Sequence, residues 1–163
     1  MTIHVTIWNE DQPGCEDHYP SGIHGALRDG LVSELGDRVR VHTATMDEPR
    51  HGLPSSVLDA TDVLLWWGHL RHAEVDDHVV AEVHRRVLTG MGLLVLHSGQ
   101  GSKIFRALMG TTCEMAWRHG DRELVWTVDP GHPIARGVPN PVVIPEQEIV
   151  VVEEAHEIPL GQV

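Results

Sequence analysis

The chain has 163 residues, of which 41% are hydrophobic and 22% are charged, an ordinary balance for one globular domain. Asp and Glu number 24 against 12 Lys and Arg, and this formal charge of -12 argues against nucleic acid and anionic membranes as partners, because most of the surface would repel a polyanion. With no signal-like N-terminus, no apolar run of membrane-spanning length and only two cysteines, we expect a cytoplasmic protein with reduced thiols.

Four short segments rich in β-branched or aromatic residues predict β-strands, and several are apolar throughout, which is typical of parallel strands covered on both faces. They are residues 3–8, 38–44, 62–68 and 92–97. Helices are predicted between them, because apolar residues recur every fourth position from Ile23 to Leu35 and from Val75 to Val87. A short helix after the second strand and another after the fourth complete the alternation. The order predicts an α/β fold with an open, doubly wound, mostly parallel sheet of the flavodoxin type.

The pattern changes after Gly110. Two further strands are predicted at residues 112–117 and 123–128, followed by a turn with one helical turn in 129–139. An edge strand is predicted within residues 141–154. No repeat, low-complexity tract or linker interrupts the chain, so we expect one domain over residues 1–163.

Polar residues follow each of the four predicted parallel strands. In open α/β sheets the ligand crevice lies beyond the carboxyl ends of the strands, so these residues are the first candidates for a site. They are Asn9 and Glu10 after the first strand, Asp47, Glu48 and His51 after the second, His69, Arg71 and His72 after the third, and His97 and Ser98 after the fourth.

The segment GMGLLVLHSGQGSKIF (90–105) indicates a buried strand, a tight turn and the start of a helix. His97 lies at the turn and is predicted to act as a base or metal ligand; the alternative is a structural cap on the strand. Ser98 is not expected to be a hydrolase nucleophile, because Leu96 stands where that elbow needs glycine. Ser98 and Lys103 are instead expected to bind substrate.

The segment WWGHLRHAEV places Trp66 and Trp67 before His69. Tryptophans can stack on a sugar face, so both are candidate substrate-binding residues, although each taken singly is more often a core residue. His69 and His72 could share a metal if the turn is helical, and a divalent ion such as zinc would need a third ligand from His97, Glu10 or another residue. Beside these, Asn9 and His24 are further substrate-binding candidates, His24 because the helix that carries it begins near the crevice.

Six stretches together resemble the trehalose-utilisation (ThuA-like) family, in nearly collinear order from residue 3 to about 149. They are VTIWNE, YPSGIHGALRDGL, ATMDEPRHGL, the long stretch from VLDATDVLLWWGHL to HSGQGSKIF, LMGTTCEMAWR and DPGHPIARGV. The family is similar in fold to class I glutamine amidotransferases, whose catalytic cysteine falls at the position of His97. The resemblance therefore implies an amidotransferase-like fold without glutaminase chemistry, and a nucleophile turn that holds a histidine.

The resemblance also implies a role in the catabolism of trehalose and related disaccharides, beside a sugar dehydrogenase that oxidises the substrate to its 3-keto form. A ketone at C3 acidifies the C2 proton, so a base could expel the group at C1 by elimination; hydrolysis is the other route. We expect His97, His69 and Glu10 to be catalytic, with His69 and His97 as ligands if a metal takes part.

Three departures from the family pattern favour an alternative function, a non-catalytic sugar-binding or regulatory module. The loop after Glu10 is short, Gln100 stands where the family has a second histidine, and PEQEIVVVEE replaces a PHEEMYGE-like segment. The family continues beyond Val163 by roughly a third of a domain, so we expect a C-terminally shortened member. A homo-oligomer is also expected, because the late apolar strand would otherwise leave an edge or a hydrophobic face uncovered.

Overall fold

The computed structural model describes residues 1–14, 17–113 and 116–151. The chain divides into two compact units, residues 1–113 and 114–163, and each is described by itself. The expectation of one domain stays a prediction. Within the described residues, no helix combines the length and apolar character needed to cross a bilayer.

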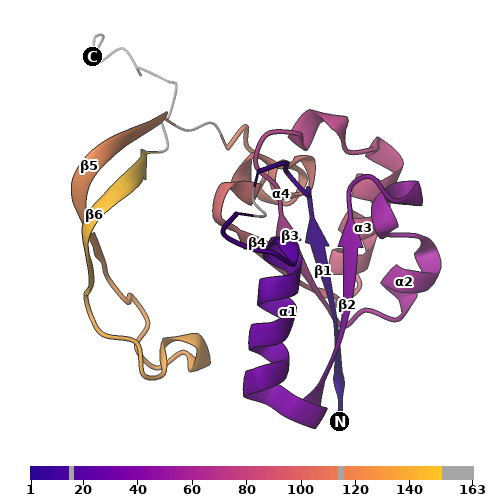
Figure 1. The fold of residues 1–163 in the computed structure, drawn as a ribbon, viewed down its shortest axis with the longest axis horizontal. Coiled ribbons are helices and arrows are strands. Elements are labelled where there is room, and N and C mark those ends of the chain that lie inside the picture. Colours follow the sequence, from indigo (N-terminus) through magenta and orange to yellow (C-terminus); the bar gives the residue numbers. More distant parts are fainter. Residues whose placement is uncertain (15–16, 114–115, 152–163) are drawn as a thin grey trace, which may run out of the picture. The chain divides into compact units, whose positions relative to one another are not determined.

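The first unit is built around a parallel sheet (Figure 1). Its strands pair in the order β2-β1-β3-β4, and every pair is parallel. The predicted α/β class with a parallel sheet is thereby confirmed, and strand bounds agree with the sequence to within a residue. The elements are β1 (Ile3–Asn9), α1 (Gly22–Leu35), β2 (Val39–Thr45), α2 (Ser55–Asp59), β3 (Val63–Trp67), α3 (Asp77–Leu88), β4 (Gly92–Leu96) and α4 (Lys103–Met109).

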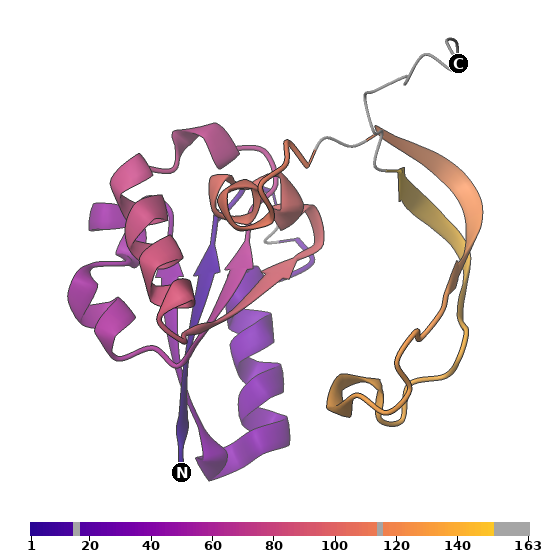
Figure 2. The ribbon, with the colours of Figure 1, turned by 180° about the vertical axis from the view of Figure 1, so that it is seen from behind.

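Helices cover both faces of this sheet, as Figures 1 and 2 show from opposite sides. On one face Leu27, Leu31 and Leu35 of α1 pack against Val5 and Ile7. On the other face a larger cluster joins the sheet to α2, α3 and α4; its fully buried members include Trp8, Leu58, Leu64, Trp66, Val79, Val83 and Ile104. Packing of the strands between two layers of helices therefore fixes the position of the carboxyl edge of the sheet.

Local signals set where two of these helices begin. The side chain of Asp76 accepts a hydrogen bond from the backbone of His78 at the start of α3, and Ser102 does the same for Phe105 at the start of α4. Gly110 ends α4 in the left-handed conformation, with a φ of 71°. The segments that lead from β3 to α3 and from β4 to α4 therefore end at defined residues, which limits how the residues of the carboxyl edge can be placed.

The second unit contains β5 (Ala116–Val125) and β6 (Val142–Val151), which pair antiparallel. The two predicted strands at 112–117 and 123–128 are thus corrected to one, because the chain continues extended through Gly120 with register shifts beside Asp121. The predicted helical turn is present at Pro133–Ala135. The late strand pairs with β5 rather than with the parallel sheet, and residues 152–154 of its predicted range lie outside the described residues.

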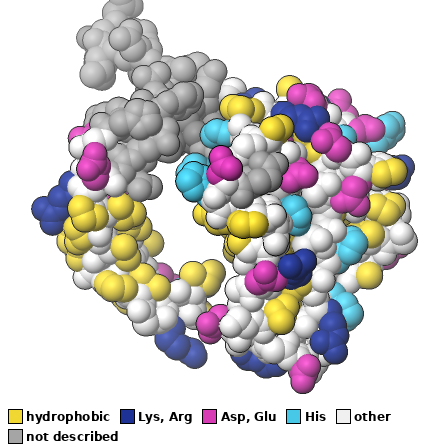
Figure 3. All heavy atoms as spheres, in the orientation of Figure 1, with side chains coloured by type: hydrophobic (Ala, Val, Ile, Leu, Met, Phe, Trp, Pro, Cys, Tyr) yellow, Lys and Arg dark blue, Asp and Glu magenta, His cyan; other side chains and the backbone are white. Residues whose placement is uncertain are grey.

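Apolar side chains gather over this ribbon in Figure 3. Several are exposed in the described part of the chain, among them Leu124, Val125, Trp126, Val138 and Val143. A two-stranded ribbon is marginal by itself in water. The expected homo-oligomer is one way to cover such a surface, and it stays a prediction.

Candidate functional site

The carboxyl ends of the four parallel strands place the predicted polar residues along one edge of the sheet. Asn9 is the register partner of both Thr45 and Trp67, and Trp67 is that of Leu96, so all four strands end at the same level. His69 and His97 follow the last residues of β3 and β4 closely in the sequence. The structure therefore brings together the strand-end segments that the sequence analysis singled out.

Glu10 is the buried anchor of this edge. Its residue is 1% exposed, and its two carboxylate oxygens accept hydrogen bonds from the backbone N–H groups of His69, at 2.7 Å, and Leu70, at 2.9 Å. Its own backbone N–H donates to the carbonyl of Trp67 at 3.0 Å. Through these contacts Glu10 positions the loop that carries His69, and its expected catalytic role stays a prediction.

His69 is exposed, and its ring is oriented by one hydrogen bond. The Ser98 hydroxyl donates its only proton to the carbonyl of Gly68 at 2.9 Å, so the 2.8 Å contact between Ser98 Oγ and His69 Nδ1 has Nδ1 as the donor. A neutral His69 then carries its lone pair on Nε2, for which the described residues provide no hydrogen-bond partner. The ring of Trp67 stacks beside it, with centroids 6.3 Å apart.

Ser98 therefore orients His69 rather than contacting substrate by itself. Its hydroxyl is used twice, once as donor and once as acceptor, and it joins the strand-end segments of β3 and β4. The sequence placed Ser98 correctly at this edge. The spacing of residues in the sequence could not show that Ser98, from the turn after β4, holds the His69 ring in place.

His72 lies close to this pair, between two glycines. A Cβ built on Gly68 would be 3.1 Å from His72 Nδ1, and one on Gly101 would be 2.8 Å from both Cδ2 and Nε2. Burial lowers the pKa of His72, with Arg106 and His69 adding to the shift, while Glu10 and the backbone of Ser98 oppose it. His72 is thus held as a neutral imidazole at the edge of the site, a role that the sequence analysis considered only as metal ligation.

His97 occupies the turn after β4 with a φ of 47°, which is unusual for a residue other than glycine. It is exposed, and among the described residues its ring has no hydrogen-bond or ion-pair partner. The ring of His97 is therefore not held by backbone groups as a structural cap would be. It is also not paired with His69, whose ring is hydrogen-bonded to Ser98. The strained turn nevertheless resembles the elbow on which other α/β enzymes present a reactive group.

Asn9 and His24 form a second pair at this edge. Asn9 is 2% exposed; its Oδ1 accepts from the backbone of Asp11 at 3.0 Å, which leaves Nδ2 to donate to His24 Nδ1 at 2.8 Å. Asn9 is thus a buried support, not the substrate contact that was expected. The neutral His24 ring carries its proton on Nε2, so a donor is available there.

Trp66 and Lys103 both have partners within the first unit. Trp66 is 1% exposed and stacks on Trp8 at 3.9 Å in the core, so its ring offers no face to a ligand, and only Trp67 keeps that possibility. The Lys103 ammonium donates to the carbonyl of Val75 at 2.7 Å and to Asp77 at 2.6 Å. It joins α4 to the start of α3, and the expected substrate contact stays a prediction.

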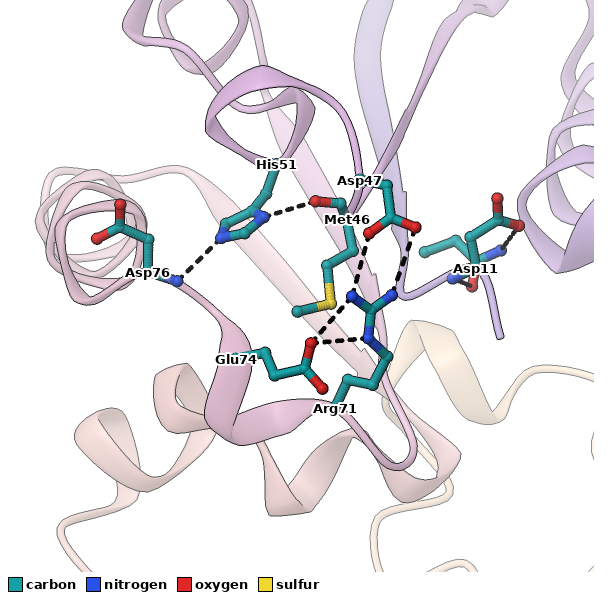
Figure 4. Close-up of polar contacts among 8 residues, drawn as sticks. Asp11, Met46, Asp47, His51, Arg71, Glu74 and Asp76 are labelled. Atoms are coloured by element: carbon teal, nitrogen blue, oxygen red, sulfur yellow. Dashed lines mark hydrogen bonds and ion pairs between the residues drawn. The ribbon is translucent and has the colours of Figure 1, made fainter. Parts of the chain in front are cut away.

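An ion cluster joins the loops that follow β2 and β3 (Figure 4). The Arg71 guanidinium lies 2.9 Å from Glu74 and 3.1 Å from Asp47, and these carboxylates, Glu74 most of all, hold the pKa of Arg71 above its usual value. His51 is fixed beside it, with Nδ1 donating to the carbonyl of Met46 and Nε2 accepting from the backbone of Asp76. Both His51 nitrogens are used, so His51 is structural.

A metal site is not assembled by these side chains. Zinc sites in proteins use at least three protein ligands. Within the described residues, no three His, Cys, Asp or Glu side chains lie close enough together to hold an ion. The described donors therefore do not fit the expected site at His69 and His97, and the divalent ion stays a prediction.

Gly101→Ala tests the packing of His72. The added Cβ would meet the ring at 2.8 Å, and Gly68 limits movement to the other side, so we expect a loss of about 1–3 kcal/mol in the free energy of unfolding. Gly30→Ala is the control: nothing lies within 4 Å of its Cβ position in α1, and we expect about 0.5–1 kcal/mol of added stability. Urea unfolding measures both. Equal changes in the free energy of unfolding for the two variants would contradict steric crowding at Gly101.

The lowered pKa of His72 makes stability depend on pH. Below about pH 6.5 the unfolded chain binds this proton more readily than the folded protein, so the free energy of unfolding should fall as the pH falls. Urea unfolding of the wild type and of His72→Gln at pH 7.5 and 5.5 measures the effect. The variant should lose less stability on acidification than the wild type; an identical pH dependence in both proteins would show that His72 is not the cause.

The chain is similar to known proteins in both sequence and fold. The family profile described as ThuA, trehalose utilisation, matches residues 4–157. Among solved structures, a protein from Bacteroides uniformis described only as ThuA-like aligns with a TM-score of 0.60 and 14% sequence identity, over 91% of this chain and 60% of that one. At this identity the likeness shows the fold alone, and the chain spans 60% of the length of that protein. No curated protein matches.

Proposed function

The chain belongs to the trehalose-utilisation (ThuA) family, and we propose that it cleaves 3-keto disaccharides of the trehalose type at the carboxyl edge of its parallel sheet. The observation that carries the proposal is the orientation of His69. Its Nδ1 is held by Ser98, which leaves Nε2 unpaired among the described residues on an exposed side chain. A neutral imidazole with one nitrogen fixed and the other free is suited to general base catalysis.

The proposed step is an elimination. His69 Nε2 removes the proton from C2, the electron pair of the C2–H bond forms the C1=C2 double bond, and the C1–O bond to the second sugar breaks. The departing oxygen takes up the proton now held on His69 Nε2, which restores the neutral base. The products are one free sugar and a ring that is unsaturated between C1 and C2 and keeps its C3 ketone. The ketone is essential, because it stabilises the negative charge that develops when the C2 proton leaves.

Other side chains at the edge supply binding and proton donation in this proposal. His97 has no partner among the described residues and stands on the adjacent turn, so it is the acid that polarises the ketone. Trp67 offers the half-exposed ring beside His69 on which a sugar face can stack. His24, with its proton on Nε2, is a hydrogen-bond donor for a sugar hydroxyl. A sugar dehydrogenase that makes the 3-keto substrate is the implied functional partner.

The second candidate is a sugar-binding or regulatory module without turnover. In this case Trp67, His24 and His69 would bind an intact disaccharide.

Incubation with 3-keto-trehalose and with trehalose separates the two functions. We expect release of glucose from the keto sugar and none from trehalose, because only the ketone acidifies the C2 proton. Glucose release is measured by a coupled assay, and binding of both sugars by calorimetry. Binding without release would support the module, whereas equal release from both sugars would contradict the elimination.

A further inference from the structure

A cleft lies on the first unit, at the amino-terminal halves of β1 and β2, away from the carboxyl edge. Its volume is about 280 Å³, and its lining includes His4, Thr6, Arg40, His42, Ser56 and Ala60. It opens where α2, with only five residues, leaves part of the edge strand β2 uncovered. Nothing in the carboxyl-edge site involves these residues.

Three basic side chains share one face of the sheet at this cleft. His4 and Arg40 are register partners on neighbouring strands, and His42 follows two residues along β2, so all three project to the same side. Neighbouring strands are about 4.8 Å apart and alternate residues about 6.6 Å apart, so the three Cα atoms form a triangle of this size. All three residues are exposed. Such a group is notable in a chain with a formal charge of -12.

The floor of the cleft is fixed and the basic groups are free. The hydroxyls of Thr6 and Thr61 are 2.6 Å apart in a buried hydrogen bond that ties the end of α2 to β1. Asp37 is the one carboxylate paired with Arg40 in the described chain, at 4.0 Å, with side chains 65% and 106% exposed, an ion pair too solvated to hold the guanidinium. Asp62 is occupied by the backbone N–H of His4.

We propose that this cleft binds the phosphate group of a small phosphate monoester. A guanidinium and two imidazoles supply several N–H donors side by side from one face of the sheet, which matches the several terminal oxygens of a phosphate better than the two of a carboxylate. The hydroxyl of Ser56 lines the same cleft and adds a neutral hydrogen-bonding group. Val57 and Ala60 add apolar surface to the lining, which suits the small carbon skeleton of the ester.

Titration of the full chain with glucose 6-phosphate, glucose and inorganic phosphate at constant ionic strength tests the proposal. Calorimetry gives the affinity, and two-dimensional NMR locates the perturbed amides. We expect saturable binding of glucose 6-phosphate and inorganic phosphate, none of glucose, and shifts confined to residues 4–6, 40–42 and 56–61. Arg40→Gln should weaken the affinity about tenfold or more, because a charge-assisted contact is lost.

Arg38→Gln is the matched control, since Arg38 is an equally charged, exposed residue two positions away that does not line the cleft. Thermal unfolding of both variants checks that the fold is kept. Arg38→Gln should leave the affinity unchanged. Absence of saturable binding, equal weakening by the two variants, or shifts at the carboxyl edge alone would each overturn the proposal. None of these results depends on cleavage of keto sugars.

Discussion

Replacing Glu10 by alanine should lower the free energy of unfolding by about 3 kcal/mol, the largest stability effect expected of a single substitution at the carboxyl edge. The carboxylate is 1% exposed and accepts the backbone N–H groups of His69 and Leu70. Removing it leaves two N–H donors without their acceptor, each of which costs about 1–3 kcal/mol when buried. The loop after β3 would also lose its anchor, so cleavage activity should fall with stability.

Glu10→Gln and Glu34→Ala make the measurement specific. Glutamine keeps one acceptor oxygen and turns an N–H donor toward the other backbone N–H, so an intermediate loss of about 1–2 kcal/mol is expected. Glu34 is an exposed residue of α1, and its replacement should change stability little. Urea unfolding compares the three variants. A Glu10→Ala variant as stable as the wild type would show that the backbone contacts are not maintained in solution.

His69→Asn should abolish cleavage of the 3-keto disaccharide, by about 10²- to 10⁴-fold in kcat, with stability nearly unchanged. The asparagine amide can take the place of Nδ1 and donate to Ser98, so the hydrogen bond at 2.8 Å is preserved in kind. What disappears is Nε2, the proposed base. Steady-state kinetics and thermal unfolding on the same preparation separate the catalytic effect from any change of fold.

His78→Asn is the control for this substitution. His78 is an exposed histidine of α3, and only its backbone N–H, not its ring, takes part in the capping of that helix. Its replacement removes one imidazole from the surface without touching the carboxyl edge, so kcat should be unchanged. If His69→Asn kept full activity, His69 would not be the base, and the turn that carries His97 would become the first candidate in its place.

The strands and helices of the first unit could be predicted because their signals are local. Apolar segments of five to seven residues form the parallel strands, and the four-residue recurrence from Ile23 to Leu35 forms α1. The family resemblance is confirmed by the profile match over residues 4–157. The position of the candidate site also followed from the sequence, since the carboxyl ends of parallel strands meet at one edge.

The roles of individual site residues could not be predicted, because they depend on partners distant in the chain. Asn9 and Glu10 were expected to face substrate, yet both are buried supports whose partners lie beyond the end of β1. Trp66 and Trp67 are adjacent and point to opposite faces of the sheet, and the sequence does not decide which of the two is fully buried. Lys103 lies in the nucleophile-turn segment but reaches Asp77, 26 residues earlier.

The β5–β6 ribbon illustrates a different limit. The sequence predicts two strands, at residues 112–117 and 123–128, and Gly120 lies between them. In the structure one strand, β5, passes through Gly120 with bulges, and this glycine adopts a φ of 82° there. A glycine inside an extended segment is consistent with either a turn or a bulge. Only the pairing with β6 selects the bulge.

Cleavage of a 3-keto disaccharide that carries deuterium at C2 tests most directly whether the carboxyl edge performs a base-catalysed elimination. We expect deuterium to be absent from C2 of the unsaturated product, and cleavage to be slower than with the substrate that carries ordinary hydrogen at C2. His69→Asn should abolish both deuterium loss and cleavage. Release of glucose at an undiminished rate, with deuterium retained at C2 of the other product, would contradict the elimination and indicate direct hydrolysis instead.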